Sequence, residues 1–419
     1  MGNFRLPINP CSPVRAISPL LLGLALGCLL ILAALAWPQP AAATDVCPNP
    51  WGVTINTDTT WRANGNPWIV ACDVTVAQNV TLTIEPGASV RFNSGRGLYV
   101  YGTLLAQGAV TETEHINFTS NAHSLAPGDW AGIFFYDTSL NSVLDYVDVD
   151  YAGSLWNGAA VTVGQDGPTA VTISHSRVRY GGEDGIRWHN GSGGSLSDVT
   201  VSDSRGDGLE ILAGSNAASP SNPTITNLTS ANNDGAAVHQ EAGARPTWAG
   251  SNAATGNLIN GIQIHGNVTA ATTWYAMGLP YIVDLGNVAV NGATTLTIQP
   301  GVIIRFNGGY YLDVNGTLTA IGTAGAPILF TSNAATPSPG DWGGIFLHDA
   351  SAGSALTYAT VEYAGTLWWG QGAISVGPDG PTTATISYST IQYSSGDGIW
   401  WGAGSTGTLD HNRHGSPVS

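Results

Sequence analysis

Acidic, arginine and histidine side chains gather in one stretch of this 419-residue sequence, between residues 145 and 189. Six of them have the chemistry of a catalytic site: His175, Arg177, Arg179, Asp184, Arg187 and His189. Such a patch on a rigid face could bind a uronic acid or carry out acid–base chemistry. The alternative interpretation, which we favour, is a ladder of ion pairs and stacked rings that holds neighbouring strands in register.

The charged residues lie in runs that align with one another without gaps. The runs LDYVDVDY from Leu144, ISHSRVRY from Ile173 and LSDVTVSD from Leu196 bring apolar residues into shared columns, at steps of 29 and then 23 residues. The same alignment makes neighbours of Asp148 and Arg177, Asp150 and Arg179, Tyr151 and Tyr180, and Tyr146 and His175. Strands of a few residues at this spacing predict a solenoid with one coil per run.

A much longer stretch of the sequence occurs twice. The phrase GDWAGIFFYD from Gly128 returns as GDWGGIFLHD from Gly340, and LTIEPGASVRFN from Leu82 returns as LTIQPGVIIRFN from Leu296. The offset between matched phrases stays between 212 and 214 residues. This pattern predicts a tandem duplication of about 213 residues, with a first copy over 59–271 and a truncated second copy over 272–419.

The charged columns belong to the first copy alone. At the matched positions the second copy carries Thr360, Glu362, Thr390 and Gln392, with Tyr388 in place of His175. A purely architectural requirement would more easily be met twice, which keeps a functional interpretation of the charged patch open.

The repeated ten-residue phrase itself predicts structural roles. Trp130 and Trp342 directly precede short apolar runs that we expect to face inward, so we interpret both as structural residues. Asp129 and Asp341 are expected to accept backbone N–H bonds in turns.

The rest of the sequence favours strands over helices. Apolar residues alternate in short runs, which 55 glycines and many Asn, Asp and Pro residues separate, and charged residues make up only 10% of the chain. The coil frame and the turns DGI from Asp184, DGL from Asp207 and DGI from Asp397 resemble those of right-handed parallel β-helix proteins of the pectin-lyase-like fold, bacterial secreted type. The resemblance implies an all-β, right-handed parallel β-helix; an array of β-sandwiches is the structural alternative.

The resemblance also implies a substrate class, because this fold hosts polysaccharide lyases and hydrolases. The sequence has no Asp-Asp pair, no GHG or RIK motif and no lysine, so no catalytic residue of those enzymes carries over. We therefore expect a non-catalytic protein that binds or displays carbohydrate, with polysaccharide or a cell-envelope glycan as its partner. A polysaccharide lyase or glycoside hydrolase and a purely structural envelope component remain the alternatives.

Aromatic residues are the predicted ligand contacts. Large rings presented from turns of a rigid solenoid can stack on sugar faces, and two such patches would add avidity. The candidate ligand-binding residues are Trp156, Trp188, Trp368, Trp369, Trp400, Trp401, Tyr151 and Tyr180. The alternative is that these rings cover the apolar column or pack under loops.

Charge excludes two classes of partner. The formal net charge is −16, which disfavours nucleic acid and anionic membrane surfaces. No cofactor is expected. Calcium is a weaker possibility, because turns such as DSRGD from Asp203 offer oxygen ligands without the period of a calcium-binding β-roll.

The N-terminus predicts export. Arg5 and Arg15 precede the apolar run SPLLLGLALGCLLILAALAW, and three alanines end at Ala43. We predict a signal peptide over residues 1–43, with an uncleaved anchor as the alternative, and an extracellular or cell-surface protein without membrane contact after cleavage.

Two cysteines remain after the leader. Cys47 and Cys72 lie in a chain expected to reach an oxidising compartment, which predicts a disulfide between them. The segment 44–58 is then expected to cap the N-terminal end of the solenoid.

Overall fold

Parallel strands of two to ten residues form most of the computed structural model, which describes residues 43–48, 50–154, 158–189, 191–214, 220–365 and 372–415. The predicted signal peptide, apart from its last residue, lies outside these ranges. The only helical turns in the described ranges are two 3-10 turns, η1 (Ala63–Gly65) and η2 (Glu112–Glu114). Within the same ranges, no helix is long and apolar enough to cross a membrane.

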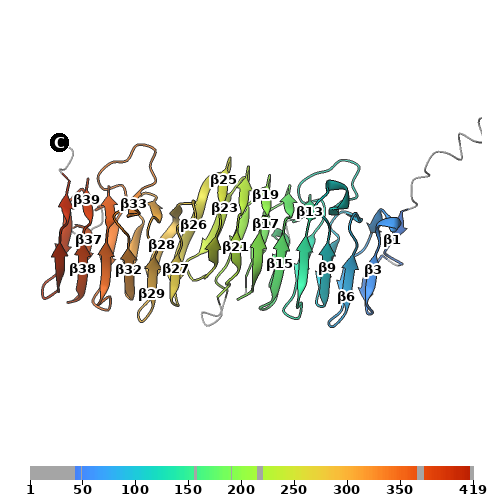
Figure 1. Ribbon diagram of the computed structural model, residues 1–419, viewed down its shortest axis with the longest axis horizontal. Coiled ribbons are helices and arrows are strands. Elements are labelled where there is room, and N and C mark those ends of the chain that lie inside the picture. The colour runs from blue at the N-terminus through green and yellow to red at the C-terminus, as the bar shows by residue number, and fades with distance from the viewer. Residues whose placement is uncertain are drawn as a thin grey trace, which may run out of the picture. The chain divides into compact units, whose positions relative to one another are not determined.

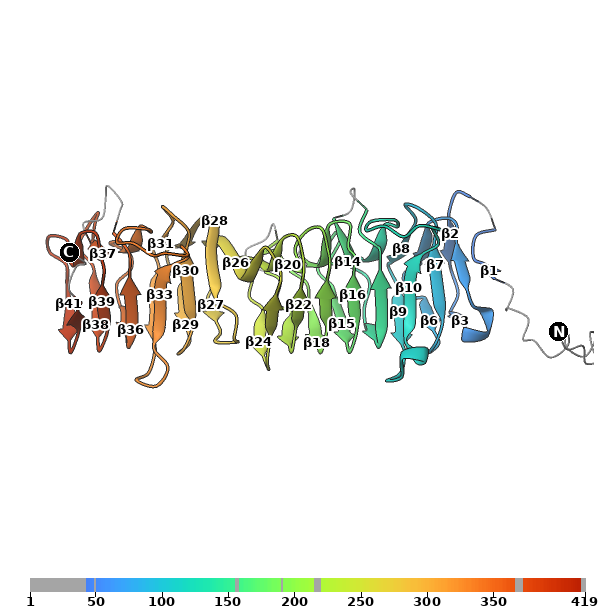
Figure 2. The same ribbon diagram turned by 90° about the horizontal axis from the view of Figure 1, so that it is seen from above.

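The strands follow one another as coils stacked in chain order (Figures 1 and 2). Each strand pairs in parallel with strands of the coils before and after it, so the strands form ladders. Ladder A contains β1 (Thr44–Asp45), β4 (Trp68–Val70), β7 (Ser89–Phe92), β10 (Ile116–Ser120), β13 (Val147–Asp150), β16 (Arg177–Arg179), β19 (Thr200–Ser202), β22 (Thr229–Ala231) and β25 (Ala253–Thr255). Ladder C contains β3 (Thr59–Trp61), β6 (Thr81–Ile84), β9 (Thr103–Gln107), β12 (Ser142–Asp145), β15 (Ala170–Ser174), β18 (Gly193–Ser197), β21 (Thr224–Thr226) and β24 (Thr247–Ala249).

Ladder B runs from the first half of the chain into the second. It contains β2 (Val53–Ile55), β5 (Val74–Val76), β8 (Gly97–Val100), β11 (Gly132–Phe135), β14 (Ala159–Val163), β17 (Asp184–Trp188), β20 (Leu209–Ile211), β23 (Ala236–Glu241), β26 (Ile259–Val268) and β28 (Tyr281–Val290). The two long strands β26 and β28 pair twice, on either side of an irregularity after Ile264.

Beyond β28, ladder B divides in two. One branch contains β30 (Ile303–Phe306), β33 (Ile328–Ser332), β36 (Ala359–Glu362), β39 (Thr390–Gln392) and β42 (Arg413–His414); the other contains β31 (Tyr311–Val314), β34 (Gly344–Leu347), β37 (Gly372–Val376) and β40 (Asp397–Trp401). Ladder D completes the second half with β27 (Thr272–Trp274), β29 (Thr295–Ile298), β32 (Thr317–Ile321), β35 (Ser354–Thr357), β38 (Thr383–Ser387) and β41 (Thr406–Asp410).

The registers predicted from the aligned runs are confirmed. Leu144 pairs with Ile173, and Ile173 pairs with Leu196, and all three side chains are buried in the core. On ladder A, Asp148 of β13 pairs with Arg177 of β16, as the alignment predicted. Successive side chains of a strand point to opposite faces, so the alternating pattern places the apolar column inside and the charges outside. Parallel pairing of this kind rules out the β-sandwich alternative.

The repeated phrase proves to be a core element in both halves. Trp130 and Trp342 are fully buried, which agrees with the structural role expected from the sequence, and their rings stack on Phe92 and Phe306, in each case with 4.0 Å between centroids. The Trp130 indole N–H donates to the carbonyl of Asp150 at 2.8 Å. A buried indole that keeps its hydrogen bond contributes both apolar burial and a satisfied polar group.

The remaining polar and glycine positions of the phrase have equally local roles. Asp129 and Asp341 accept backbone N–H bonds from Ala126 and Ser338, as predicted. Gly132 has a φ of +126°, and a Cβ at this position would approach the carbonyl oxygen of Ala160 to 2.8 Å. Only glycine fits where the next coil lies this close.

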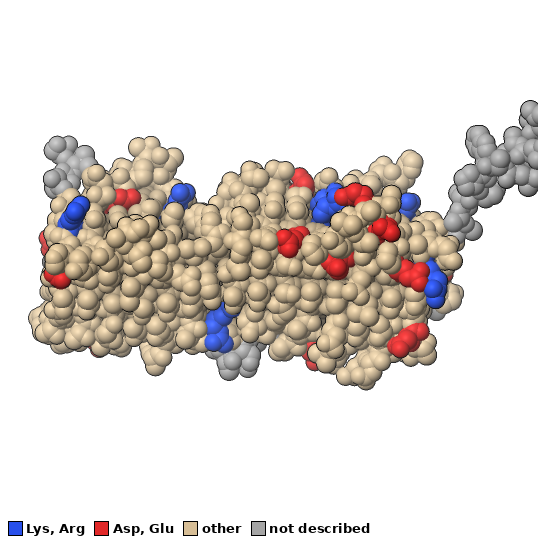
Figure 3. Space-filling model, viewed as in Figure 1, with Lys and Arg blue, Asp and Glu red and all other residues tan. Residues whose placement is uncertain are grey.

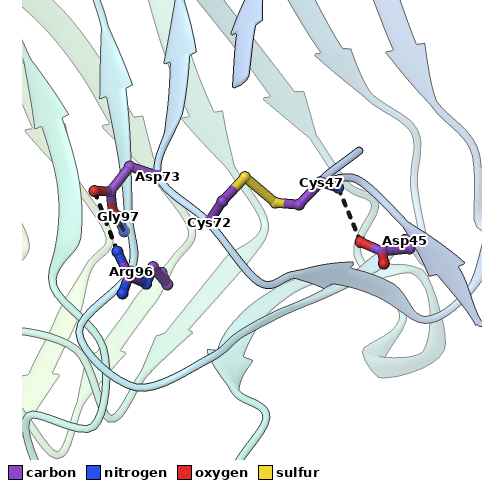
Figure 4. Close-up of a disulfide and its surroundings, with 6 residues drawn as sticks. All are labelled: Asp45, Cys47, Cys72, Asp73, Arg96 and Gly97. Atoms are coloured by element: carbon purple, nitrogen blue, oxygen red, sulfur yellow. Dashed lines mark hydrogen bonds and ion pairs between the residues drawn. A yellow bond between two sulfur atoms is a disulfide. The ribbon is translucent and has the colours of Figure 1, made fainter. Parts of the chain in front are cut away.

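A disulfide joins Cys47 to Cys72, as predicted (Figure 4). It ties the segment before β2 to the corner that follows β4, where Asp73 accepts the backbone N–H of Gly97. The bond therefore connects the first coil to the coil above it.

Replacing Cys72 by serine is expected to lower the free energy of unfolding of the first coils by about 3 kcal/mol, because the cross-link spans 25 residues. Solenoid coils interact mainly with their neighbours, so hydrogen exchange should accelerate in β2–β8 and remain slow from β14 onward. Reduction of the wild-type protein should reproduce the effect. Uniform loss of protection along the chain would contradict this expectation.

Candidate functional site

The corners on both sides of ladder A place outward side chains on left-handed backbone. One corner column, just before the ladder A strands, contains Tyr146, His175, Asp198 and Asn227, and the other, just after them, contains Tyr151, Tyr180, Asp203 and Asn232; each residue has a φ between 45° and 63°. Among residues other than glycine, Asn and Asp adopt this conformation most readily, because their short polar side chains tolerate it, whereas a bulky tyrosine there is unusual. The tyrosines therefore occupy positions that local backbone preference does not explain.

The aromatic corner residues of adjacent coils stack in pairs. Tyr151 and Tyr180 have centroids 4.8 Å apart and planes 12° apart, and Tyr146 stacks on His175 at 4.7 Å. We call the outward face of β13 and β16, with these rings at its two margins, the first shelf. All four aromatic residues of this shelf are at least partly exposed.

The second half builds a matched arrangement on β36 and β39, which we call the second shelf. Tyr363 stacks on Tyr393 at 5.1 Å, and Tyr358 stacks on Tyr388 at 5.0 Å. All four residues again have positive φ, and Tyr388 is 45% exposed. These four tyrosines were not among the predicted ligand contacts, although their alignment with the first copy was a signal that could have found them.

Between its rings, the first shelf has two bidentate ion pairs. Arg177 donates to both oxygens of Asp148, at 2.6 and 2.8 Å, and also to Glu112. Arg179 donates to both oxygens of Asp150, at 2.9 Å each. Each guanidinium thus neutralises a carboxylate of the preceding coil, which agrees with the ladder that we favoured from the sequence.

Glu112, His115 and Asp148 form the only cluster in the described ranges whose ligand atoms lie close enough to hold a metal ion. His115 and Asp148 are buried, and the Arg177 guanidinium donates to both carboxylates. The arginine therefore already supplies positive charge at this cluster. Glu112 and His115 were not predicted from the sequence, because they lie in a segment that differs between the two copies.

A second charged cluster lies on ladder B of the first half. Arg187 donates to Asp184 at 2.7 Å and to Glu210, and His239 Nδ1 lies 3.4 Å from Asp207 and 3.5 Å from Glu210. Arg187, Glu210 and His239 follow one another in register along β17, β20 and β23. Glu210 and His239 were missed in the sequence, because only the strand pairing brings them beside Arg187.

The cluster on ladder B separates the pKa values of its carboxyl groups. Burial, and then the charge of Glu210, raise the pKa of Asp184 to about 7. Burial also opposes ionisation of Glu210, but hydrogen bonding to His239 and the charge of Arg187 outweigh it and lower the pKa of Glu210 to about 2. Burial lowers the pKa of His239, whereas its bonds to Asp207 and Glu210 raise it to about 10.

The structure therefore distributes the six predicted catalytic residues over two faces. Arg177 and Arg179 lie on ladder A, and Asp184 and Arg187 lie on ladder B. His175 lies at the corner before β16, where its Nδ1 is 2.9 Å from Asp145. His189 follows β17, and its backbone N–H donates to Val163. No hydrogen bond or ion pair within the described ranges joins the two groups of arginines.

One of the predicted ligand-binding tryptophans, Trp188, is wrong, and Trp401 is only partly exposed. Trp188 is fully buried, and its indole N–H donates to the carbonyl of Gly193, so its ring faces the core rather than a ligand. Trp401 packs against the core from the inward side of β40. Trp400 precedes it on the same strand and therefore points outward, on the branch of ladder B that does not carry the second shelf. Trp156, Trp368 and Trp369 lie outside the described residues.

One further acid–histidine group occurs in the second half alone. His348 bonds through Nε2 to Asp313 and through Nδ1 to Asp379 at 2.9 Å. The hydrogen bond to Asp313 raises the pKa of His348 most. Burial opposes this effect, the bond to Asp379 adds to it, and the resulting pKa is about 9. Tyr136 occupies the matched position in the first half.

Replacing His348 by glutamine is expected to lower stability in a pH-dependent way. Because the folded-state pKa is raised, the contribution of the imidazolium is fully present below about pH 6.5 and is lost as pH rises through 9. After allowance for solvent screening, we expect a loss of about 1–2 kcal/mol near neutral and acidic pH. Guanidinium unfolding across this pH range measures it, and Tyr136→Phe is the control; a loss that does not change with pH would contradict it.

Comparison with known families supports the architecture. Residues 266–398 match the family model described as a pectate-lyase like beta helix domain, and residues 157–273 match the one described as a right handed beta helix region. A search of curated proteins and a search of solved structures each gave no significant match. With the parallel ladders, the two matches show that this chain is a right-handed parallel β-helix protein of the pectin-lyase-like fold.

Proposed function

We propose that this protein is an exported, non-catalytic β-helix that binds polysaccharide, with sugar rings stacking on the aromatic residues of its two shelves. The partner is an extracellular or cell-envelope glycan. Stacking on a sugar face needs partly exposed rings, and the paired tyrosines of both shelves are partly exposed, each with one face against its partner.

The observation that carries the proposal is the choice of tyrosine at left-handed corners. Asp203 and Asn232 fill the same column as Tyr151 and Tyr180 in later coils. A bulky residue in this conformation costs about 1–3 kcal/mol, and such strain concentrates at functional sites. The chain accepts this cost at matched places in both halves, which favours a shared binding role.

The charged face between the rings supports binding rather than catalysis. Asp148 and Asp150 are each held by both donors of one guanidinium, so neither side chain is available as a general base without breaking its pair. Figure 3 shows that charged side chains are sparse on the face drawn and lie mainly over the N-terminal half. Large uncharged areas of this kind suit a ligand bound through rings and hydroxyl groups.

The substitutions Tyr180→Asn and Tyr393→Asn test the proposal, because asparagine suits the left-handed backbone while it removes the ring. The chain from Thr44 onward is passed over a sizing column with a panel of polysaccharides, and the eluted polymer is analysed beside the protein. We expect co-elution of intact polymer with the wild type and its loss in the variant carrying both substitutions, with stability changed by less than about 1 kcal/mol. Absence of co-elution with every polymer would overturn the proposal in favour of a structural role.

A glycoside hydrolase is the second candidate, and the separated pKa values of Asp184 and Glu210 favour it. One carboxyl group that stays protonated to about pH 7 beside one that ionises at about pH 2 is the pairing an acid–base mechanism needs. The test is shortening of polymer in the same column experiment and its loss in Asp184→Asn. The other catalytic candidate, His175, is tested by His175→Ala, and an unchanged rate removes it from the mechanism.

A further inference from the structure

We infer that the polysaccharide bound at the two shelves is uncharged rather than acidic. This inference rests on the proposed function and narrows its ligand class. The inference follows from the side chains that lie between the rings of each shelf. An acidic sugar needs an available cation there, whereas an uncharged sugar needs hydroxyl, amide and aromatic groups.

Both arginines of the first shelf already form ion pairs with carboxylates. Arg177 is bound by Asp148 and Glu112, and Arg179 is bound by Asp150. Each guanidinium is already neutralised by a carboxylate, so a sugar carboxylate would gain little net attraction, and it could take the paired Nε and Nη2 donors only by displacing Asp148 or Asp150. Asp148 is 4% exposed, so its displacement would leave a buried carboxylate without its counter-ion, which is strongly unfavourable. The ion pairs thus make the first shelf poor at binding anions.

The second shelf has no cation on β36 or β39 themselves, and the nearest arginine on this branch of the described structure is Arg413 of β42, which pairs with Thr390. Strands β36 and β39 present Thr360, Glu362, Thr390 and Gln392, in register with one another. Both oxygens of Glu362 accept hydrogen bonds from neutral groups, one from Gln392 at 2.7 Å and one from Thr331 at 2.9 Å. The carboxylate has no arginine to neutralise it and would repel an acidic sugar.

The two shelves therefore share rings but not charges. Tyr151 and Tyr180 correspond to Tyr363 and Tyr393, whereas the arginine pairs of the first shelf have no counterpart in the second. A ligand common to both shelves is recognised by the features that both possess. The net charge of −16 adds long-range repulsion of any polyanion.

Exposed arginines on the same ladders provide the competing explanation: besides Arg413 beside the second shelf, each half has one farther along. Arg91 on β7 and Arg305 on β30 lie two strands before the shelf strands β13 and β36, or about 10 Å along the stack. An acidic polymer that contacted both the tyrosine rings and these arginines would need the arginines for tight binding. Their substitution therefore distinguishes the two ligand classes.

The test uses pairs of polymers that share a backbone and differ in charge. The probes are hydroxyethyl cellulose against carboxymethyl cellulose, and methyl-esterified polygalacturonate against polygalacturonate. Affinity electrophoresis is run with the wild type, with Tyr180→Asn plus Tyr393→Asn, and with Arg91→Gln plus Arg305→Gln plus Arg413→Gln. We expect at least one uncharged polymer to bind at least about tenfold more tightly than its charged partner, with little dependence on salt up to about 0.5 M.

The outcomes separate this inference from the proposed function. Tighter binding of a charged polymer that weakens in salt and in the arginine variant, yet still requires the tyrosines, would overturn the uncharged ligand and retain carbohydrate binding. Binding that survives in the tyrosine variant, or no binding to any polymer, would overturn both. The arginine variant should leave the binding of uncharged polymer unchanged.

Discussion

Replacing Trp130 by alanine is expected to lower the free energy of unfolding by about 3–5 kcal/mol. The ring is fully buried, stacks on Phe92 at 4.0 Å, and donates its N–H to the carbonyl of Asp150. The substitution removes all three contributions and leaves a cavity between coils. Trp342→Ala should have an effect of similar size, because its stacking on Phe306 is the same.

Guanidinium unfolding followed by circular dichroism measures the effect. Trp130→Phe keeps an aromatic ring against Phe92 but loses the hydrogen bond, so we expect a smaller loss, of about 1–2 kcal/mol. Leu258→Ala is the control, since this side chain is 77% exposed and its removal should change stability by less than about 0.5 kcal/mol. A loss of less than about 1 kcal/mol in Trp130→Ala would show that the buried indole does not hold the coils together.

Loss of either shelf is expected to weaken binding of a long polysaccharide by at least about a hundredfold. The shelves lie roughly 40 Å apart along one stack at about 4.8 Å per coil, the first on ladder A and the second on the branch of ladder B, so a polymer long enough to span both is presented to the second shelf at high effective concentration. Tyr180→Asn or Tyr393→Asn alone should remove this avidity. A short oligosaccharide, which cannot reach both shelves, should instead show an unchanged dissociation constant and half the stoichiometry.

Isothermal titration with polymer and with oligosaccharide distinguishes the two effects. Tyr101→Ala is the control, because Tyr101 stacks on Tyr136 at 4.1 Å outside both shelves and should leave affinity unchanged. Equal weakening for long and short ligands would mean that the shelves act independently. A twofold change or less with long polymer would mean that the second shelf does not engage the same chain.

The stacking register could be predicted from the sequence because it depends on a period. A parallel coil must place each inward side chain over the one before it, so a gap-free alignment of runs is an alignment in space. The columns through Leu144 and Asp148 followed directly, as did the structural role of Trp130, which precedes an inward strand. The disulfide was predictable for a simpler reason, since Cys47 and Cys72 were the two cysteines left after the leader.

The candidate site was only partly predictable. Tyr151 and Tyr180 were identified from their alignment, but their left-handed backbone, which gives them their significance, is invisible in a sequence. Trp188 was assigned to the surface because a tryptophan near a glycine-rich turn can face either way. Its inward position follows from its register with Val163 and Ile211 of the neighbouring coils.

The class of fold, the register of the coils and the acidic, lysine-free composition all follow from residue type and spacing, and so could be predicted from the sequence. The pairing of the charged side chains depends instead on contacts between residues far apart in the chain. Arg177 reaches Glu112 across 65 residues, and Arg187 meets Glu210 only because β17 and β20 lie side by side. Whether an arginine can bind a ligand depends on the partners that the winding of the chain brings to it, and here those partners turn the charged patch of the first half into ion pairs.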